Sequence, residues 1–159
     1  MKARLLKVIG SIGLGAGVWA WWTTPRSGAR PEGSCQSGPV SSDLQLGELS
    51  LRYWSFLRRH TVGLIQPRLS KGGVDITLLG GPTLIHLGGP TQSPNRITWP
   101  VQWGLLVGRS GGIFSFTLQE GYLEMKLDSF VPRLPRPLYL LTQNLLHCWI
   151  GNSLLKELA

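Results

Sequence analysis

Three histidines, His60, His86 and His147, are the residues of this sequence with the widest range of possible chemistry. Zinc ligands that share one element stand a few residues apart, whereas these three fall on different predicted elements. A three-histidine metal site therefore requires the fold to bring all three together. Cys148 follows His147, but neighbouring residues on a helix point about 100° apart and form no catalytic pair. The sequence predicts neither a metal nor a cofactor.

Carboxylates are the other side chains that could support catalysis, and only Glu120, Glu124 and Asp128 cluster. Glu124 and Asp128 share the polar side of a predicted strand with Lys126, a pattern typical of a solvated strand face. The sequence has no Gly-x-Ser-x-Gly motif for a nucleophilic serine. An enzyme acting on an apolar substrate is therefore the weakest of the functions that the sequence allows.

Aromatic and basic residues are the more unusual candidates. Trp99 and Trp103 alternate onto one face of a predicted strand, which is usually a core face. Arg133 and Arg136 stand at the start of a predicted helix, where they oppose the macrodipole unless an anion such as a lipid phosphate joins them. The alternative is that both arginines are exposed in a proline-rich turn. These four residues and His147, which lies on the polar stripe of that helix, are the five candidate ligand-binding residues.

The positive charge of the chain is concentrated near its beginning. The formal net charge is +8, and residues 1–30 contain five basic residues and no acidic one, so the remainder carries +3. Only 15% of all residues are charged. A nucleic-acid-binding domain usually has a dense basic stripe, which is missing here, so the sequence predicts no nucleic-acid partner.

The first residues have the layout of a leader. Three basic residues precede the uncharged stretch Val8–Trp22, whose end carries three tryptophans where an aromatic belt would lie. Residues 1–24 are therefore predicted to be a signal peptide or a single transmembrane anchor. The tryptophans favour the uncleaved anchor, with most of the chain outside the cytoplasm. The alternatives are secretion after cleavage near Ala29 and a buried N-terminal helix.

Two pairs of residues bear on association and cross-linking. Gly13 and Gly17 have the small-xxx-small spacing that lets two membrane helices approach closely, which predicts a weak helix dimer. The alternative is that these glycines only lower the hydrophobicity of the leader. Cys35 and Cys148 allow one disulfide if the chain is exported, or remain two unpaired thiols.

The folded domain is predicted to begin after a linker. Residues 25–42 are rich in proline, glycine and serine, which indicates a flexible segment. The domain then covers residues 43–159. Helical spacing of apolar residues predicts a helix over 49–60 with Asp43 as its cap, although 44–60 also nearly alternates as a strand.

Short strands follow this helix. Alternation predicts one strand over 74–79. The sequence Leu-Gly-Gly-Pro-Thr then occurs twice, at 79–83 and 87–91, and each copy is typical of a chain reversal. The four residues 84–87 between the two copies are predicted to form a second strand.

A three-stranded meander is the best-determined part of the sequence. Its strands are predicted at 98–103, 112–118 and 122–128, with a two-residue turn at Glu120-Gly121. This turn fixes the register, in which apolar residues meet on one face and polar residues on the other. The apolar pairs are Phe114 with Leu127, Phe116 with Met125, and Leu118 with Leu123.

The fold class that we predict is α+β, an antiparallel meander of about five strands packed on a long C-terminal helix. That helix, at 138–158, is apolar on most of its circumference, which requires burial on several sides or contact with lipid. The order of elements over residues 49–158 is similar, at fold level, to helix-grip proteins of the START type, whose curved sheet holds a C-terminal helix around an apolar cavity. The likeness rests on no residue motif and assigns no site residue.

The function predicted first is a membrane-tethered or exported, non-enzymatic domain that binds an apolar or lipid-like ligand, or the membrane surface. The first alternative is an envelope interaction or structural module that offers a sheet edge to a partner protein. The second alternative is a small enzyme acting on an apolar substrate. A cavity of sufficient size distinguishes the first function from its first alternative, and convergent polar groups inside it favour the enzyme.

Overall fold

The computed structural model describes residues 31–41, 43–135, 139 and 145–159. Several sequence predictions therefore lie outside the described residues. They concern the anchor or signal peptide at 1–24, the helix dimer through Gly13 and Gly17, cleavage near Ala29, and the role of Arg136. Within the described ranges, no helix has the length and hydrophobicity needed to cross a bilayer.

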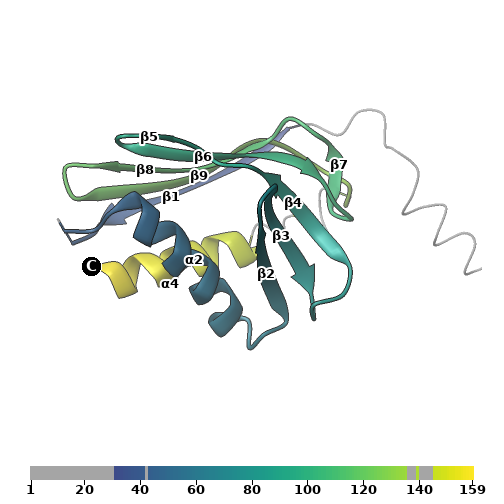
Figure 1. Ribbon diagram of the computed structural model, residues 1–159, viewed down its shortest axis with the longest axis horizontal. Helices are drawn as coiled ribbons and strands as arrows, with labels where there is room; N and C mark the ends of the chain where they lie inside the picture. The colour runs from purple at the N-terminus through teal and green to yellow at the C-terminus, as the bar shows by residue number, and fades with distance from the viewer. Residues whose placement is uncertain (1–30, 42, 136–138, 140–144) are drawn as a thin grey trace, which may run out of the picture.

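A strongly curved antiparallel sheet dominates the described part of the chain (Figure 1). Its nine strands are β1 (Glu32–Pro39), β2 (Ile65–Ser70), β3 (Gly73–Leu78), β4 (Thr83–Gly88), β5 (Thr91–Ser93), β6 (Arg96–Trp103), β7 (Val107–Arg109), β8 (Ile113–Gln119) and β9 (Tyr122–Pro132). Their order is β1-β9-β8-β6-β4-β3-β2, with β5 paired to β6 and β7 paired to β9. The α+β class and the meander are confirmed, whereas the predicted number of about five strands is too low.

Two helices, α2 (Leu46–His60) and α4 (Leu145–Leu158), lie on the concave side of this sheet (Figure 1). The helix predicted over 49–60 is confirmed as α2, and the strand alternative for this segment is wrong. Asp43 is not its cap, because Gln45 occupies the N-cap position and makes no side-chain capping bond. Glu48 and Arg52 instead form an i,i+4 ion pair at 2.7 Å over the first turns.

The sheet bends at β6, because this strand changes partner along its length. Residues Arg96–Pro100 pair with β8, whereas Val101 and Trp103 pair with β4. Gln102 between them is an extra residue that forms a β-bulge in the ladder with β4. A bulge increases the local twist and reverses the side on which the next side chain points. In Figure 1, β4, β3 and β2 therefore turn away from the layer of β1, β9 and β8 and flank the helices.

The hairpin of β8 and β9 has the predicted register. The opposite residues include the predicted apolar pairs Phe114 with Leu127, Phe116 with Met125, and Leu118 with Leu123. Glu120 and Gly121 have φ values of 50° and 75°, as a two-residue turn between twisted strands requires. The sequence prediction of this hairpin is confirmed in all its pairs.

Aromatic side chains fill the space between the meander and α2. The ring of the fully buried Phe116 lies 5.1 Å from that of Tyr53 and 5.3 Å from that of Trp99, both edge to face. Trp54 adds a further edge contact to Trp99 at 5.7 Å. Such edge contacts are the preferred aromatic geometry, so one face of α2 fixes how the helix sits on the sheet.

Part of the segment predicted as a linker is strand β1, so the structure differs from the sequence prediction here. β1 pairs with β9 from Glu32 opposite Phe130 to Pro39 opposite Tyr122. Its side chains are mostly polar or absent, which is why composition indicated a linker. The strand is held by its backbone bonds and by α4, which packs against it. The two cysteines, one in β1 and one in α4, form no disulfide.

The described residues bury one side of helix α4 more fully than the other. Ile150, Leu154 and Leu158 are buried, whereas Leu146 and Trp149 expose 36% and 49% of their surface. These two residues are three positions apart and therefore lie on one face of the helix. Among the described residues, this helix therefore leaves a strip of apolar surface that the sheet and α2 cover only in part.

Candidate functional site

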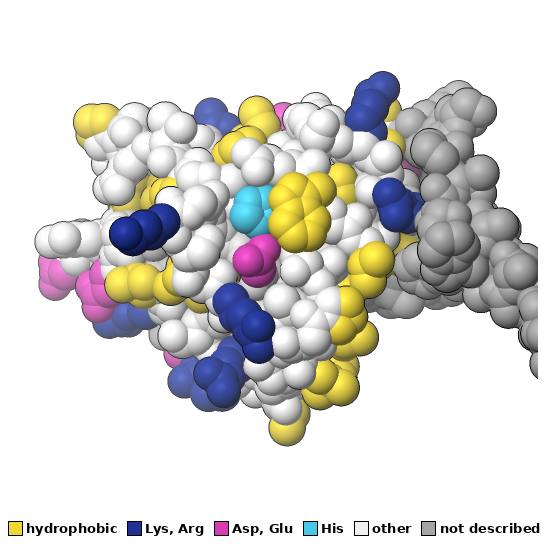
Figure 2. All heavy atoms as spheres, turned by 45° about the vertical axis from the view of Figure 1, so that its right-hand side comes forward, with side chains coloured by type: hydrophobic (Ala, Val, Ile, Leu, Met, Phe, Trp, Pro, Cys, Tyr) yellow, Lys and Arg dark blue, Asp and Glu magenta, His cyan; other side chains and the backbone are white. Residues whose placement is uncertain are grey.

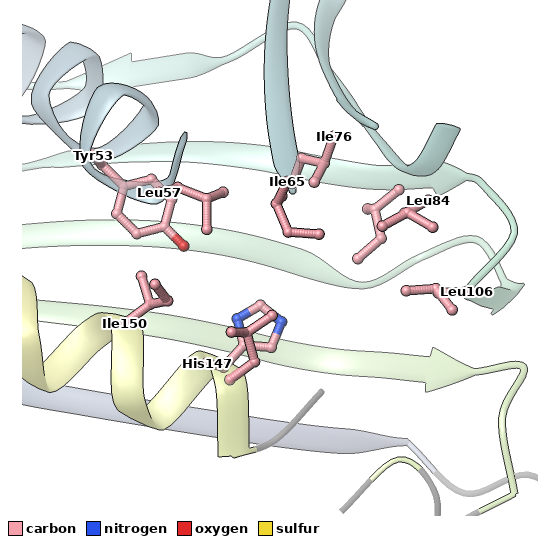
Figure 3. A pocket seen from close by; sticks show the side chains of 10 residues that line it. Tyr53, Leu57, Ile65, Ile76, Leu84, Leu106, His147 and Ile150 are labelled. Atoms are coloured by element: carbon pink, nitrogen blue, oxygen red, sulfur yellow. The ribbon is translucent and has the colours of Figure 1, made fainter. Parts of the chain in front are cut away.

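An apolar pocket lies between the sheet and the two helices (Figure 3). Its lining residues are Tyr53, Leu57, Ile65, Ile76, Leu84, Ile85, Leu106, Leu146, His147 and Ile150. The pocket volume is ≈ 70 Å³. This is about twice the roughly 30 Å³ that one water occupies, and about half the roughly 150 Å³ of a cavity that holds benzene. The pocket therefore has room for the end of an apolar chain and not for a whole lipid.

Two polar groups point into this pocket, the phenol of Tyr53 from α2 and the imidazole of His147 from α4 (Figure 3). Burial raises the pKa of Tyr53 far above its usual value. Burial among apolar side chains also lowers the pKa of His147 to about 4. Both groups are therefore uncharged at neutral pH, and the imidazole has one donor and one acceptor to offer.

The low pKa of His147 predicts a loss of stability on mild acidification. Between pH 6.5, the ordinary pKa, and about 4, the unfolded chain binds a proton that the folded protein does not. The free energy of unfolding should therefore fall as the pH is lowered through this window. Denaturant titrations of the wild type and His147→Leu over this range isolate the contribution. Parallel losses in both proteins would show that His147 is not held neutral.

Arg133 lies next to one wall of the pocket. Its backbone N–H donates a hydrogen bond of 2.9 Å to the carbonyl oxygen of Leu106, which lines the pocket. The Nε of its guanidinium is buried and has no acceptor among the described residues. A buried donor without an acceptor is costly, so this group is suited to an anion. Arg136, predicted beside it, lies in the undescribed segment.

Trp99 and Trp103 do not share a face, contrary to the sequence prediction. Trp99 is 2% exposed and packs in the core, whereas Trp103 is 53% exposed. The cause is the bulge at Gln102, which shifts the alternation by one residue between the two tryptophans. Trp99 is therefore a core residue with no access to a ligand, and Trp103 lies on the outer face of the sheet.

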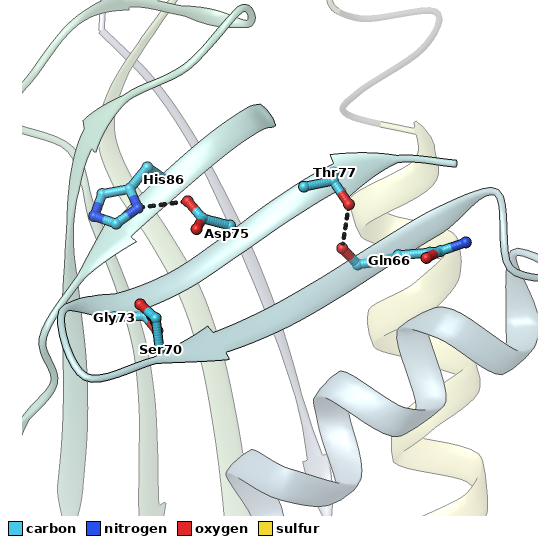
Figure 4. Close-up of polar contacts among 6 residues, drawn as sticks. All are labelled: Gln66, Ser70, Gly73, Asp75, Thr77 and His86. Atoms are coloured by element: carbon cyan, nitrogen blue, oxygen red, sulfur yellow. Dashed lines mark hydrogen bonds and ion pairs between the residues drawn. The ribbon is translucent and has the colours of Figure 1, made fainter. Parts of the chain in front are cut away.

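Trp103 ends a row of four side chains that the sequence analysis did not find. Arg68 on β2, Asp75 on β3, His86 on β4 and Trp103 on β6 are opposite one another from strand to strand. His86 Nδ1 lies 2.7 Å from Asp75 Oδ1 (Figure 4), and its ring stacks on Trp103 with centroids 4.9 Å apart. Figure 2 looks onto a face where a histidine lies between an acidic and a hydrophobic side chain.

The sequence contains only part of the signal for this row. The turn sequence at 79–83 predicts that β3 and β4 form a hairpin, but the register of this hairpin shifts between Ile76 and Thr77, so counting from the turn does not place Asp75 opposite His86. Trp103 could not be placed either, because its position depends on the bulge at Gln102. For this reason the sequence assigned Trp103 to the core face.

The row has limited chemical capacity. The carboxylate of Asp75 orients the imidazole, as in many catalytic and metal sites. However, the imidazole of His86 is hydrogen-bonded to no described side chain other than that of Asp75. No group of three histidine, cysteine or acidic side chains in the described ranges could hold a metal ion. The row therefore has neither a nucleophile nor a metal set on which to base a reaction.

Comparison with protein-family models, with curated proteins and with solved structures found no match to this chain. What the protein does must therefore follow from its own residues. Of the two constellations, only the pocket combines a concave apolar volume with polar groups pointing inward, and Arg133 is bonded through its backbone to the lining residue Leu106.

Proposed function

We propose that this protein is a membrane-tethered or exported domain that binds an apolar, lipid-like ligand without chemical conversion. The observation that carries the proposal is the pocket between the sheet and the helices, which is aliphatic except for Tyr53 and His147. One end of an acyl chain fits its ≈ 70 Å³. The rest of the acyl chain would lie along the half-exposed side chains of Leu146 and Trp149, which extend the apolar surface outward from the pocket.

Arg133 supports an anionic head group on this ligand. Its buried Nε lacks an acceptor within the described part of the chain, and its backbone is bonded to the pocket wall at Leu106. A carboxylate or phosphate would satisfy this donor through a charge-assisted hydrogen bond. Arg136, three residues further along the chain, is proposed to share this role.

We further propose that the likeness to helix-grip proteins of the START type extends to ligand binding. The apolar pocket between the curved antiparallel sheet and the C-terminal helix would then be the binding site. The small volume of the pocket restricts the proposal to ligands that insert one chain end. Tyr53 and His147 would then contact the inserted end or a polar group close to it.

Binding of decanoate tests this proposal directly. Full-length protein extracted in detergent should bind decanoate in native mass spectrometry. The Leu84→Phe variant, in which the larger side chain fills the pocket, should have an affinity for decanoate that is lower by about tenfold or more. The estimate corresponds to excluding about two methylene groups at roughly 0.8 kcal/mol each. Equal binding by the wild type and Leu84→Phe would place the ligand elsewhere and overturn the proposal.

The role of Arg133 has its own matched control. Arg133→Gln should weaken the binding of decanoate and leave decanol unaffected, because only the carboxylate interacts with the guanidinium. Equal loss for both ligands would mean that the variant damages the pocket, and no loss for either would remove Arg133 from the site.

A second candidate, the interaction module, is favoured by strand β2. This strand is at one end of the sheet, and its Leu69 is 60% exposed. An edge strand with exposed apolar residues can pair with a strand of a partner. If no apolar ligand binds, this edge becomes the leading site.

A further inference from the structure

Two turns lie side by side at one end of the domain and expose apolar side chains. One joins α2 to β2, and the other joins β3 to β4; the backbone N–H of Leu79 in the second donates a 2.8 Å bond to the carbonyl of Leu64 in the first. Val62 is 93% exposed, Leu79 68% and Leu64 49%. We call these three residues the apolar tip. It borders the ligand pocket through Ile65, which lines the pocket and follows Leu64 directly.

The backbone at the apolar tip is held in an unfavourable conformation. Val62 and Leu79 have φ values of 52° and 50°, in the left-handed region where glycine and asparagine are favoured and a β-branched residue is an outlier. Neither the local conformation nor packing within the described domain accounts for apolar side chains at these two positions. Single exposed apolar residues are ordinary, but three on two bonded turns form one surface.

Positive charge surrounds the apolar tip. A shallow hollow of ≈ 440 Å³ beside Val62 is lined by Ser55, Arg58, Arg59, Val62 and Gly63. Arg59 is paired with Glu157 of α4 at 2.6 Å, whereas Arg58 has no acidic partner within the described ranges. On the other side, the Arg68 guanidinium lies over the β3–β4 turn, 2.9 Å from where a Cβ of Gly80 would be.

We propose that the apolar tip docks on an anionic lipid bilayer. Val62, Leu64 and Leu79 enter the boundary between head groups and acyl chains, and Arg58 and Arg68 bind lipid phosphates beside them. Apolar side chains flanked by cations are the composition of interfacial membrane-binding elements. Three side chains are also a small surface, whereas a stable protein interface needs about 800 Å² per partner.

This inference deepens the proposed function, because a tip inserted next to the pocket would place the pocket at the lipid surface. The inference rests on the proposed function only in taking the membrane as the partner. The docking surface and the ligand pocket consist of different residues, so an experiment can contradict membrane docking and ligand binding independently.

The test uses the full-length chain with Cys35→Ser and Cys148→Ser, so that one new cysteine carries a polarity-sensitive fluorophore. Val62→Cys reports on the apolar tip, and Lys71→Cys, in the turn at the other end of β2, is the control. In vesicles containing phosphatidylserine, emission from position 62 should shift to the blue and that from position 71 should not. In pure phosphatidylcholine vesicles, and at high salt, the shift should be smaller.

Removing charge should weaken the docking. Arg58→Gln combined with Arg68→Gln should lower the ratio of inserted to exposed tip by roughly tenfold or more, since each cation near an anionic surface contributes substantially to binding.

Equal emission at positions 62 and 71 in both vesicle types overturns the inference. A blue shift without lipid that grows with protein concentration also overturns it, in favour of self-association. Leu84→Phe should keep the shift, because residue 84 lies outside the apolar tip. Docking by the wild-type protein together with no decanoate binding by the wild-type protein would contradict the proposed function alone.

Discussion

Replacing Phe116 by alanine should lower the free energy of unfolding by about 3–5 kcal/mol, the range for a buried phenylalanine. Phe116 is fully buried and its ring is in contact with those of Tyr53, Trp99 and Phe114. Truncation would therefore remove three aromatic contacts and leave a cavity where α2 packs on the sheet. Chemical denaturation followed by tryptophan fluorescence measures the loss.

Thr117→Ala is the matched control for this prediction. Thr117 is the next residue of β8, and its side chain points to the opposite face, where it lies across from Glu124. Its truncation should cost under about 1 kcal/mol. Equal losses for Phe116→Ala and Thr117→Ala would mean that the two faces of the hairpin are assigned wrongly.

Gly73→Ala should be the other strongly destabilising substitution, with a loss of about 3 kcal/mol or more. Gly73 has a φ of 139°, and a Cβ there would lie 1.9 Å from the carbonyl oxygen of Leu87. This oxygen belongs to the backbone of β4, so it cannot move without disturbing the ladder between β3 and β4. The midpoint of thermal or chemical unfolding gives the effect.

Gly72→Ala, one residue earlier, provides the comparison. A Cβ on Gly72 would meet no atom within 4 Å, so this substitution should change stability by less than about 1 kcal/mol. If Gly73→Ala is as stable as Gly72→Ala, β3 does not approach β4 as closely as the structure shows.

The hairpin of β8 and β9 was predictable because its signals are local. Alternation of apolar residues defines both strands, and the turn at Glu120-Gly121 fixes the register without reference to the rest of the chain. Helix α2 was predictable for a similar reason, since Leu49, Tyr53 and Phe56 repeat at helical spacing and all face the core.

Strand β1 was not predictable from composition. Its sequence, from Glu32 to Pro39, supplies few apolar side chains, so nothing in it indicates a core element. It belongs to the sheet through backbone bonds to β9, and α4 packs on it with the side chain of Leu155 beside Gly38. A backbone-held edge strand leaves almost no pattern in its own residues.

The candidate site was predictable only in part. His147 and Arg133 were chosen for their residue type and position; His147 lines the pocket, whereas Arg133 reaches its wall only through the backbone bond to Leu106. Tyr53 has the helical spacing of a core residue, and nothing in the sequence indicates that its hydroxyl group points into a pocket. The pocket itself depends on how side chains from α2, α4, three strands and one loop fill space, and no local pattern encodes this.

The central claim is that an acyl chain end occupies the pocket, and nuclear Overhauser effects between ligand and protein test it most directly. With isotope-labelled full-length protein and unlabelled decanoate, the terminal methyl of the ligand should show cross-peaks to the methyl groups of Ile65, Leu84 and Ile150, which line the pocket. Cross-peaks confined to exposed residues such as Leu69, or no cross-peaks at saturating decanoate, would contradict the claim.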